Sequence, residues 1–431
     1  MTILLPPAPT NSAARSSLNA LLTSRSLLLA MKALRDELGD VFLLPMPGFK
    51  AIVLSGPEAA HFTYVNARIS LRWRTEDDPV TGLLRHGLLV EDRESHDDLR
   101  HGVMPYLHRQ KVDGYLQTFI SRTDQACEIW DLGQPMDMLV EMRRVALLIL
   151  MDALFAVDIS PEIDQLWSAI MRTIKCISPG AWLLWQDIPR PGFERALREL
   201  DQYIYGVIAA QRANNRSSDN LIMHLISSGM SDALIRDQML TLLIAGHDTS
   251  TALLAWAIYS LTSHPHAMLL AQEEVDTVLG DQVPSHELIG RLVYLEQVIN
   301  ETLRLYPPIH VSNRLVVEEL EFNGYRIPSG HRLMFSIYLT HHDKNHWPQP
   351  ERFDPQRFAP GVGRLPYTFI PFGGGPRNCI GAAFAQVEAK AVLARLLQRY
   401  NFTLLQPSVR LYMGATLEPR PGVLVQVTRR R

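Results

Sequence analysis

The chain has 431 residues and a formal net charge of −3, and this near balance of charge gives no support for nucleic acid or an acidic membrane surface as its main partner. A hydrophobic fraction of 47% is ordinary for a globular protein, and the length is ample for a large buried core. Three cysteines cannot form a fully paired disulfide framework, so we expect a soluble protein in the reducing cytoplasm.

Residues 1–38 are predicted to form an N-terminal arm and a lead-in helix ahead of one large domain, residues 39–431. The apolar runs at residues 4–9 and 27–30 fall well short of the ~20 apolar residues that a membrane-spanning helix needs, so no membrane anchor is expected. No repeat, low-complexity tract or Gly/Ser linker interrupts the chain, which favours a single domain. We expect this domain to be monomeric.

Two patterns follow the arm. Residues 41–55 alternate apolar segments around Pro45–Gly48, which predicts a β-hairpin. From about Ser95 to Pro307, apolar residues recur at three- and four-residue spacing, so this long part of the chain is predicted to be mostly helical.

Within this helical part, residues 241–261 are apolar enough to suggest a membrane span. However, polar residues from His247 to Thr251 lie at the centre of the segment, where a charge is most costly in lipid. Extended from Ser231 to Pro265, the segment would form a helix about 50 Å long. We therefore predict a helix buried through the core, polar where it meets the functional site.

β-like patterns return over residues 314–340, where Asn323-Gly324 is a tight-turn signal between two short apolar runs. An irregular stretch follows from His341 to Pro371. A last helix is predicted from Gly381 to about Tyr400, and two short strands in the tail. The sequence therefore predicts a mostly α fold with a small β-rich side.

A glycine-rich loop, Phe372-Gly-Gly-Gly375-Pro-Arg377-Asn-Cys379-Ile-Gly381, stands directly before this last helix. Glycines tolerate positive φ, so the backbone can curl tightly around a bulky group. Cys379 falls at a helix N-terminus, where free N–H groups stabilise a thiolate as a ligand or nucleophile. The alternative for a lone cysteine is a buried, inert thiol beside a turn. The chain has no Cys-x-x-Cys pair at this place for zinc or an iron–sulfur cluster.

The pattern Phe-x-x-Gly-x-Arg-x-Cys-x-Gly resembles the haem-binding loop of the cytochrome P450 family. The resemblance implies that Cys379 is the axial thiolate of haem b, that Phe372 packs near its sulfur and that Arg377 faces a haem propionate. Gly375 and Gly381 match the glycines of the motif. Thiolate ligation pushes electron density onto the iron and favours O–O cleavage.

Glu301 and Arg304 lie three residues apart near the end of a predicted helix and can pair on one face. In the family this pair is buried and joined by an arginine from the irregular stretch. Arg357 has the better register relative to the haem loop, and Arg352 remains the alternative.

The run Ala245-Gly246-His247-Asp248-Thr249 resembles the oxygen-activation motif on the long central helix of the family. The resemblance implies that Ala245 lies against the haem and that Gly246 lets the helix distort to admit dioxygen. Asp248 and Thr249 would relay protons. From composition alone, these residues could equally form a polar kink in a buried helix.

Two further positions resemble contacts of the family to the haem propionates. His96 and Arg100 lie four residues apart, on one helix face, and other members have Trp in the place of His96. Arg314 stands at the start of the β-like stretch. Cations on one face suit a dianionic edge.

The resemblance implies a triangular, mostly α fold and insertion of one oxygen atom of O₂ into a lipophilic substrate. Electrons from NAD(P)H would arrive through a separate ferredoxin or flavodoxin with its reductase. Alternatives are an isomerase, dehydratase or peroxygenase on the same fold, or a non-catalytic haem-binding protein. The substrate pocket is expected at five segments: residues 73–90, 182–185, the face around Ala245, 309–313 and the turn near Ala415.

Overall fold

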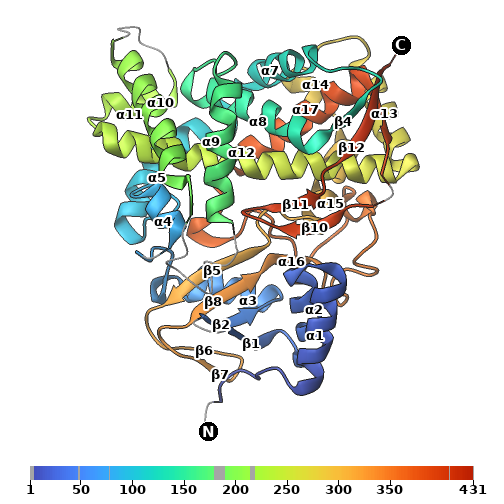
Figure 1. Cartoon of the computed structure of the whole chain (residues 1–431). Coiled ribbons are helices and arrows are strands. Elements are labelled where there is room, and N and C mark those ends of the chain that lie inside the picture. The colour runs from blue at the N-terminus through green and yellow to red at the C-terminus, as the bar shows by residue number, and fades with distance from the viewer. Residues whose placement is uncertain are drawn as a thin grey trace.

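The computed structural model describes residues 4–46, 49–76, 78–178, 190–213, 219–406 and 408–430. A large helical part lies above a smaller β-rich part, and the two N-terminal helices flank the sheet (Figure 1). The helices are α1 (Asn11–Ser24), α2 (Leu27–Leu38), α3 (Pro57–His61), α4 (Pro79–Leu84), α5 (Arg93–Leu107), α6 (Arg109–Asp113), α7 (Leu116–Glu128), α8 (Met138–Phe155), α9 (Ile163–Ile177), α10 (Phe193–Ala213), α11 (Leu221–Ser227), α12 (Asp232–Ser263), α13 (Pro265–Leu279), α14 (His286–Gly290), α15 (Val293–Leu305), α16 (Ile337–His341) and α17 (Ala382–Arg399).

The strands are β1 (Val41–Met46), β2 (Phe49–Leu54), β3 (Leu71–Arg72), β4 (Pro135–Asp137), β5 (Val311–Val316), β6 (Leu320–Phe322), β7 (Tyr325–Ile327), β8 (Arg332–Ser336), β9 (Tyr400–Leu404), β10 (Arg410–Met413), β11 (Leu417–Arg420) and β12 (Leu424–Arg429). Within the described ranges, the main sheet has the order β1-β2-β8-β5-β3, in which only β2 and β8 pair in parallel. The strands β4, β12 and β9 form a second sheet, and β10–β11 and β6–β7 are two-stranded.

The strands of both predicted hairpins are paired. The hairpin over residues 41–55 is confirmed, since Val41 pairs with Leu54 across β1 and β2; residues 47–48 lie outside the described residues. Asn323 and Gly324 have φ values of 49° and 77°, the positive angles that a two-residue hairpin turn requires, and they connect β6 to β7.

Two local predictions were wrong. Residues 337–341 form helix α16 instead of a strand, because the Ser336 hydroxyl accepts a hydrogen bond from the Leu339 amide and caps a helical turn. After α17 the chain forms β9 to β12, more than the two strands expected. Strand β12 pairs with the distant β4 as well as with β9, and local patterns carry no information on such long-range pairing.

The long helix α12 runs through the middle of the helical part, as predicted (Figure 1). The Ser231 hydroxyl caps its N-terminus, and most of its residues are buried on every side by α8, α10, α15 and α17. Even Arg236 is fully buried on it, where it pairs with Asp201 and Asp237. A helix enclosed by other helices has no solvent face, so its residues show no polar stripe.

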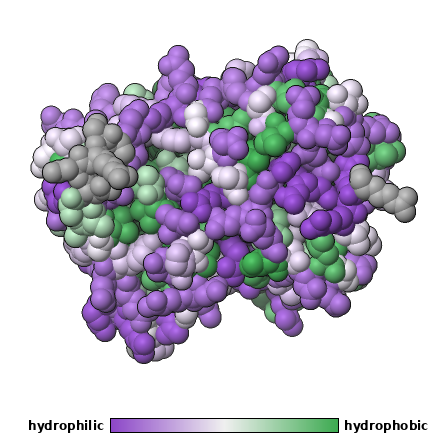
Figure 2. Space-filling view, turned by 90° about the horizontal axis from the view of Figure 1, so that it is seen from above, coloured by the Kyte–Doolittle hydropathy of each residue, from purple (hydrophilic) through white to green (hydrophobic). Residues whose placement is uncertain are grey.

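The N-terminal helices are packed on the sheet, and the surface carries both hydrophilic and hydrophobic residues. Leu28 and Met31 of α2 are fully buried with Phe42 of β1, so the lead-in helices pack onto the sheet. On the face shown in Figure 2, hydrophobic residues form separate patches among hydrophilic ones. Within the ranges that the structure describes, we find no helix with the length and apolar character needed to cross a bilayer.

Candidate active site

The loop that carries Cys379 is closed by its own backbone. The Cys379 amide donates to the Phe372 carbonyl over 2.8 Å, and α17 begins three residues later. Gly375 has a φ of 64°, and a Cβ at this position would lie 2.2 Å from the carbonyl oxygen of Tyr64. Only glycine fits such a close approach, so the loop has the tight curl that its sequence predicted.

The Cys379 side chain keeps accessible surface, and desolvation by the surrounding protein is the main influence that raises the pKa of the thiol. The Gly381 amide and the Arg100 guanidinium oppose this rise. Cys127 differs, because it is buried in the core and its pKa is raised to about 12, mainly by desolvation.

A cavity of about 380 Å³ collects three of the predicted site residues. His96 of α5, Arg314 of β5 and Arg377 of the cysteine loop line it, together with Tyr64 and Asp92. These residues come from four segments far apart in the chain, and only the tertiary fold brings them together.

Arg314 indicates which kind of chemical group this cavity could bind. Its guanidinium lies 5.0 Å above the ring of Trp73 and donates to the Asn313 carbonyl, and no described carboxylate forms an ion pair with it. Desolvation, and secondly the charge of Arg377, lower the pKa of Arg314 to about 10. A buried cation on the cavity wall, without an ion-pair partner among the described residues, fits the dianionic propionate edge of a haem.

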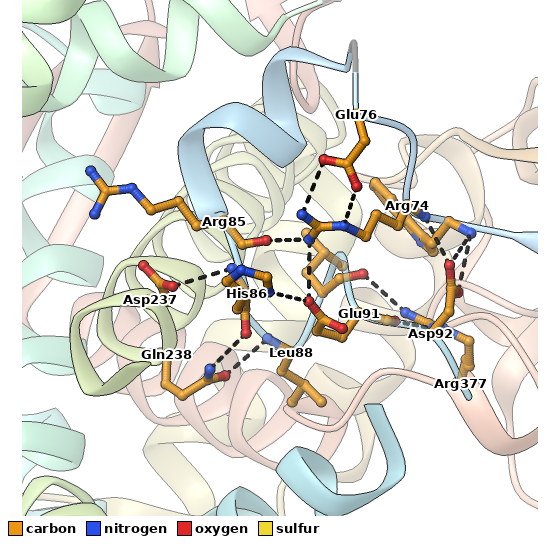
Figure 3. A network of polar contacts seen from close by, with 12 residues as sticks. Arg74, Glu76, Arg85, His86, Leu88, Glu91, Asp92, Asp237, Gln238 and Arg377 are labelled. Atoms are coloured by element: carbon orange, nitrogen blue, oxygen red, sulfur yellow. Dashed lines mark hydrogen bonds and ion pairs between the residues drawn. The ribbon is translucent and has the colours of Figure 1, made fainter. Parts of the chain in front are cut away.

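Arg377 is fixed from the loop that precedes α5 (Figure 3). It forms a 2.9 Å ion pair with Asp92 and donates to the carbonyl oxygens of Glu91 and Leu89. Asp92 also accepts the backbone amides of Trp73 and Arg74. The sequence analysis missed Asp92, although its position directly before α5 was a signal that it could accept from several amides.

The other end of that loop is held by α12 (Figure 3). Asp237 accepts the His86 amide, and the Gln238 amide group bonds both the Leu88 amide and the His86 carbonyl. Both α12 residues are buried, and the sequence analysis missed them. The central helix is therefore connected to Arg377 through one short loop.

His96 and Arg100 have different surroundings although they share a face of α5. His96 is buried at the cavity, and burial, followed by the charge of Arg377, lowers its pKa, so its ring is uncharged at neutral pH. Arg100 donates to the carbonyl and the side-chain oxygen of Asn378, directly before Cys379. The structure thus places His96 with the cavity and Arg100 on the cysteine loop.

The residues of the polar motif on α12 contact different parts of the protein. The Thr249 hydroxyl donates to the Ala245 carbonyl over 2.8 Å, within an unbroken helix. A Cβ on Gly246 would lie 2.4 Å from Leu150 of α8, so the absence of a side chain here serves close helix packing. Asp248 is buried and accepts the Thr416 hydroxyl, and burial raises its pKa to about 6.

The buried ion pair on α15 has the expected geometry. Arg304 donates to both oxygens of Glu301 over 2.7 and 2.8 Å, and both side chains are fully buried. Arg357 Nε lies 3.4 Å from Glu301 Oε1. Arg352 offers only its backbone carbonyl to Arg304, while its own side chain is exposed. The structure brings Arg357, and not Arg352, to the glutamate.

A protein-family model described as Cytochrome P450 matches residues 6–424 of the chain. The chain belongs to the cytochrome P450 family. This P450 is 34% identical to "Putative cytochrome P450 139" of Mycobacterium tuberculosis, over 92% of this chain and 97% of that protein. It is 29% identical to cyclooctatin synthase of Streptomyces melanosporofaciens, over 93% and 90% of the two chains.

The fold agrees with the family. A solved structure described as retinoic acid bound cyanobacterial CYP120A1 superposes with a TM-score of 0.86 over 100% of both chains, at 23% identity. The mostly α prediction is therefore confirmed. As a member of its family, this P450 is a haem-thiolate monooxygenase that uses O₂ and electrons supplied by redox partners.

Proposed function

We propose that Cys379 is the thiolate ligand of haem b in this P450, and that the enzyme inserts one oxygen atom of O₂ into a lipophilic organic substrate. The observation that carries this proposal is the closed loop of Cys379, from which Arg377 reaches the same cavity as Arg314 and His96. When bound, a thiolate-ligated haem supplies the oxygen activation. Phe372, Gly375, Gly381 and Arg100 shape and hold the loop around the ligand.

The residues around the cavity would bind and orient the haem edge. Arg314 and Arg377 offer charge to the propionates. His96 lines the same cavity, and its Nδ1 lies 2.8 Å from Asp97 Oδ1, so its one N–H is directed to that carboxylate. Ala245 on α12 would lie against the haem, and its small side chain would leave room for O₂ and substrate. The ion-pair group of Glu301, Arg304 and Arg357 would stabilise the fold of the domain.

Asp248 and Thr249 would handle protons for the reaction. A carboxyl group with a pKa of about 6 exchanges protons readily near neutral pH, which is the property a relay group needs. The Thr249 hydroxyl can donate either to the Ala245 carbonyl or to a group bound next to the helix. The presence of this acid–alcohol pair is what favours a monooxygenase over an isomerase, dehydratase or peroxygenase on the same fold.

The substrate is proposed to be a lipophilic molecule such as a fatty acid, terpenoid or steroid. One solved relative is described as bound to retinoic acid, which supports an apolar ligand class. Of the expected pocket segments, residues 182–185 lie outside the described residues. Ala415 is half-buried, and its amide donates to the Ser178 hydroxyl over 2.9 Å.

We further propose a cytoplasmic monomer whose catalytic domain spans residues 39–431, with residues 1–38 as a packed lead-in. Its electrons would come from a ferredoxin or flavodoxin and a reductase that passes them on from NAD(P)H. The near-neutral net charge of −3 leaves room for a local basic surface to attract an acidic donor protein.

One reconstitution experiment tests the proposed reaction. Purified haem-loaded enzyme, a ferredoxin, its reductase and NADPH are supplied with ¹⁸O₂ and a panel of lipophilic compounds that change the spin state of the ferric haem. We expect products with one ¹⁸O atom, formed only with NADPH. Product formed with peroxide alone would favour the peroxygenase. Product formed without added oxygen would favour the isomerase or dehydratase. Binding that changes the haem spectrum but gives no product would favour the non-catalytic alternative.

A further inference from the structure

Asp248 is one of two buried carboxylates that share a single guanidinium. Arg143 of α8 lies between them: its Nη1 is 3.3 Å from Asp248 Oδ1, and its Nη2 makes a closer contact with Glu418 of β11. The side chains of Arg143, Asp248 and Glu418 are 9%, 2% and 6% exposed. Neither Arg143 nor Glu418 has a place in the function proposed above.

The two carboxylates are held unequally. Glu418 has a second cation, since its other oxygen lies 3.1 Å from Nη2 of Arg420, whose side chain is 48% exposed. Asp248 has only the longer contact to Arg143 and the 2.8 Å hydrogen bond that the Thr416 hydroxyl donates to Oδ2. Its Oδ1 has no hydrogen-bond partner among the described residues. Two buried negative charges close to each other repel, so the less well-held carboxyl takes up a proton more readily.

The charges around Asp248 act on its pKa in opposite directions. Burial raises the pKa most and Arg143 lowers it next; Glu418 then raises it, and the Thr416 hydrogen bond and Arg420 lower it. His247, the neighbour on α12, is uncharged at neutral pH, because burial and secondly Arg143 lower its pKa to about 3. Besides burial, the charges that act on Asp248 therefore come from α8 and β11.

The elements that carry these partners are fixed to α12. Trp256 of α12 donates its indole N–H to the Leu417 carbonyl over 2.8 Å, which anchors β11 beside the helix (Figure 1). Arg143 is itself held, since its Nη1 lies 3.1 Å from the Met171 sulfur of α9 and its carbonyl is 3.2 Å from His247 Nε2. Because the backbones are fixed, Arg143 can choose between the two carboxylates only by a small movement of its side chain.

We propose that Arg143 and Glu418 are positioning residues that act through Asp248. Arg143 holds the Asp248 carboxylate in place, and Glu418 competes for Arg143, so that Asp248 remains able to gain and lose a proton. The inference rests on the proposed role of Asp248 in proton relay. Arg420 extends the same line of charges to the surface.

The two positioning residues act on Asp248 with opposite sign, and this allows a sharp test. In Glu418→Gln the competitor loses its charge but keeps its shape, so Arg143 serves Asp248 alone and the titration midpoint of Asp248 falls by about 1 pH unit. In Arg143→Gln the cation is lost and the midpoint rises by about 1 to 3 pH units. Arg143→Lys restores the charge and brings the midpoint back towards that of the wild type.

The midpoint is measured on ferric, haem-loaded enzyme by infrared spectroscopy. The carbonyl stretch of protonated Asp248 is the band that disappears in Asp248→Asn, and its intensity is followed against pH. Arg144→Gln is the matched control: Arg144 follows Arg143 on α8 but pairs with the exposed Asp164, so the midpoint is expected to stay unchanged. Haem content and the ferrous–CO spectrum verify that each variant is folded.

Shifts in opposite directions for Glu418→Gln and Arg143→Gln support the proposal. Equal midpoints in all variants, or shifts of the same sign, overturn it; if Arg143→Gln does not fold, Glu418→Gln and Arg143→Lys decide. The relay role is tested separately by Asp248→Asn. If that variant consumes oxygen at the wild-type rate, the relay role is refuted, while opposite midpoint shifts would still establish the positioning. If that variant is slow but the midpoints do not shift, the relay role stands without Arg143 and Glu418.

Discussion

Arg377 and Asp92 form an ion pair with 2.9 Å between Nη1 and Oδ1, and this pair connects the cysteine loop to the loop that precedes α5. Both side chains are more than four-fifths buried, at 16% and 18% exposure. Asp92 also accepts two backbone amides, so one carboxylate orders both the guanidinium and the chain around it. The cavity that Arg377 lines depends on this arrangement.

Asp92→Asn should therefore loosen the haem edge of the site. The loss of charge-assisted hydrogen bonds is expected to lower the free energy of unfolding by about 2 kcal/mol and to speed haem loss to an acceptor protein. Urea unfolding and haem-transfer kinetics measure the two effects. Asp98→Asn, at an exposed position of α5, is the control and should change neither. Equal haem retention in both variants would contradict the role given to Asp92.

Cys379→Ser should abolish the strongly red-shifted Soret band of the ferrous–CO form, because a thiolate ligand is required for it. Cys176→Ser changes a half-buried cysteine elsewhere in the chain and should keep the band. Absorption spectra of the two reduced, CO-treated variants make the comparison. A red-shifted band that survives in Cys379→Ser would remove the central assignment.

Glu301→Ala, Arg304→Ala and Arg357→Ala should each give poorly folded or haem-poor protein. Breaking one partner of a buried ion pair costs about 3–5 kcal/mol, a large share of the stability of a domain, although Arg357 with its longer contact should cost less. Arg352→Ala is the matched control, since the Arg352 side chain is exposed. Soluble yield and haem per chain are the readouts, and a haem-poor Arg352→Ala with a normal Arg357→Ala would reverse the choice.

Thr249→Ala should keep the fold, the haem content and approximate substrate affinity, but it should release peroxide in place of product. Asp248→Asn should slow oxygen consumption itself, by about 10²–10⁴-fold if proton delivery limits the rate, with a larger solvent isotope effect. Product and peroxide are quantified against NAD(P)H consumed. Thr251→Ala is the control, because the Thr251 hydroxyl donates to the His247 carbonyl, just as the Thr249 hydroxyl donates to the Ala245 carbonyl two residues earlier on α12. Fully coupled turnover in Thr249→Ala would refute the relay.

Glu388 should give the stability of this P450 a dependence on pH. It is fully buried on α17, its one resolved partner is Ser250, and desolvation raises its pKa from 4.5 to about 8. The folded protein thus binds this proton more tightly than the unfolded chain, so the contribution is complete at low pH and is lost as pH rises towards 8. Glu388→Gln should match the wild type in acid and exceed its melting temperature at alkaline pH. Glu287→Gln, at an exposed position, should have the melting temperature of the wild type throughout. The same pH dependence of the melting temperature in all three proteins would refute the assignment.

The sequence by itself determined those features that depend on neighbouring residues. The glycines and Cys379 of the loop, the Asn323-Gly324 turn and the apolar run of α12 are local patterns, because a turn or a helix is set by the few residues that form it. These patterns were sufficient to indicate the family and the fold class, and they gave the candidate residues for the haem site.

Only the tertiary structure decided which distant groups meet. Asp92 joins Arg377 across more than 280 residues of chain, Arg143 comes between Asp248 and Glu418, and Arg357 rather than Arg352 reaches Glu301. Such contacts arise from the packing of whole helices and strands, and their geometry depends on ångström-scale distances that no local pattern encodes. Buried charges make these distances matter most, because in a poorly solvated interior one cation more or less at 3 to 4 Å changes which carboxyl keeps its proton.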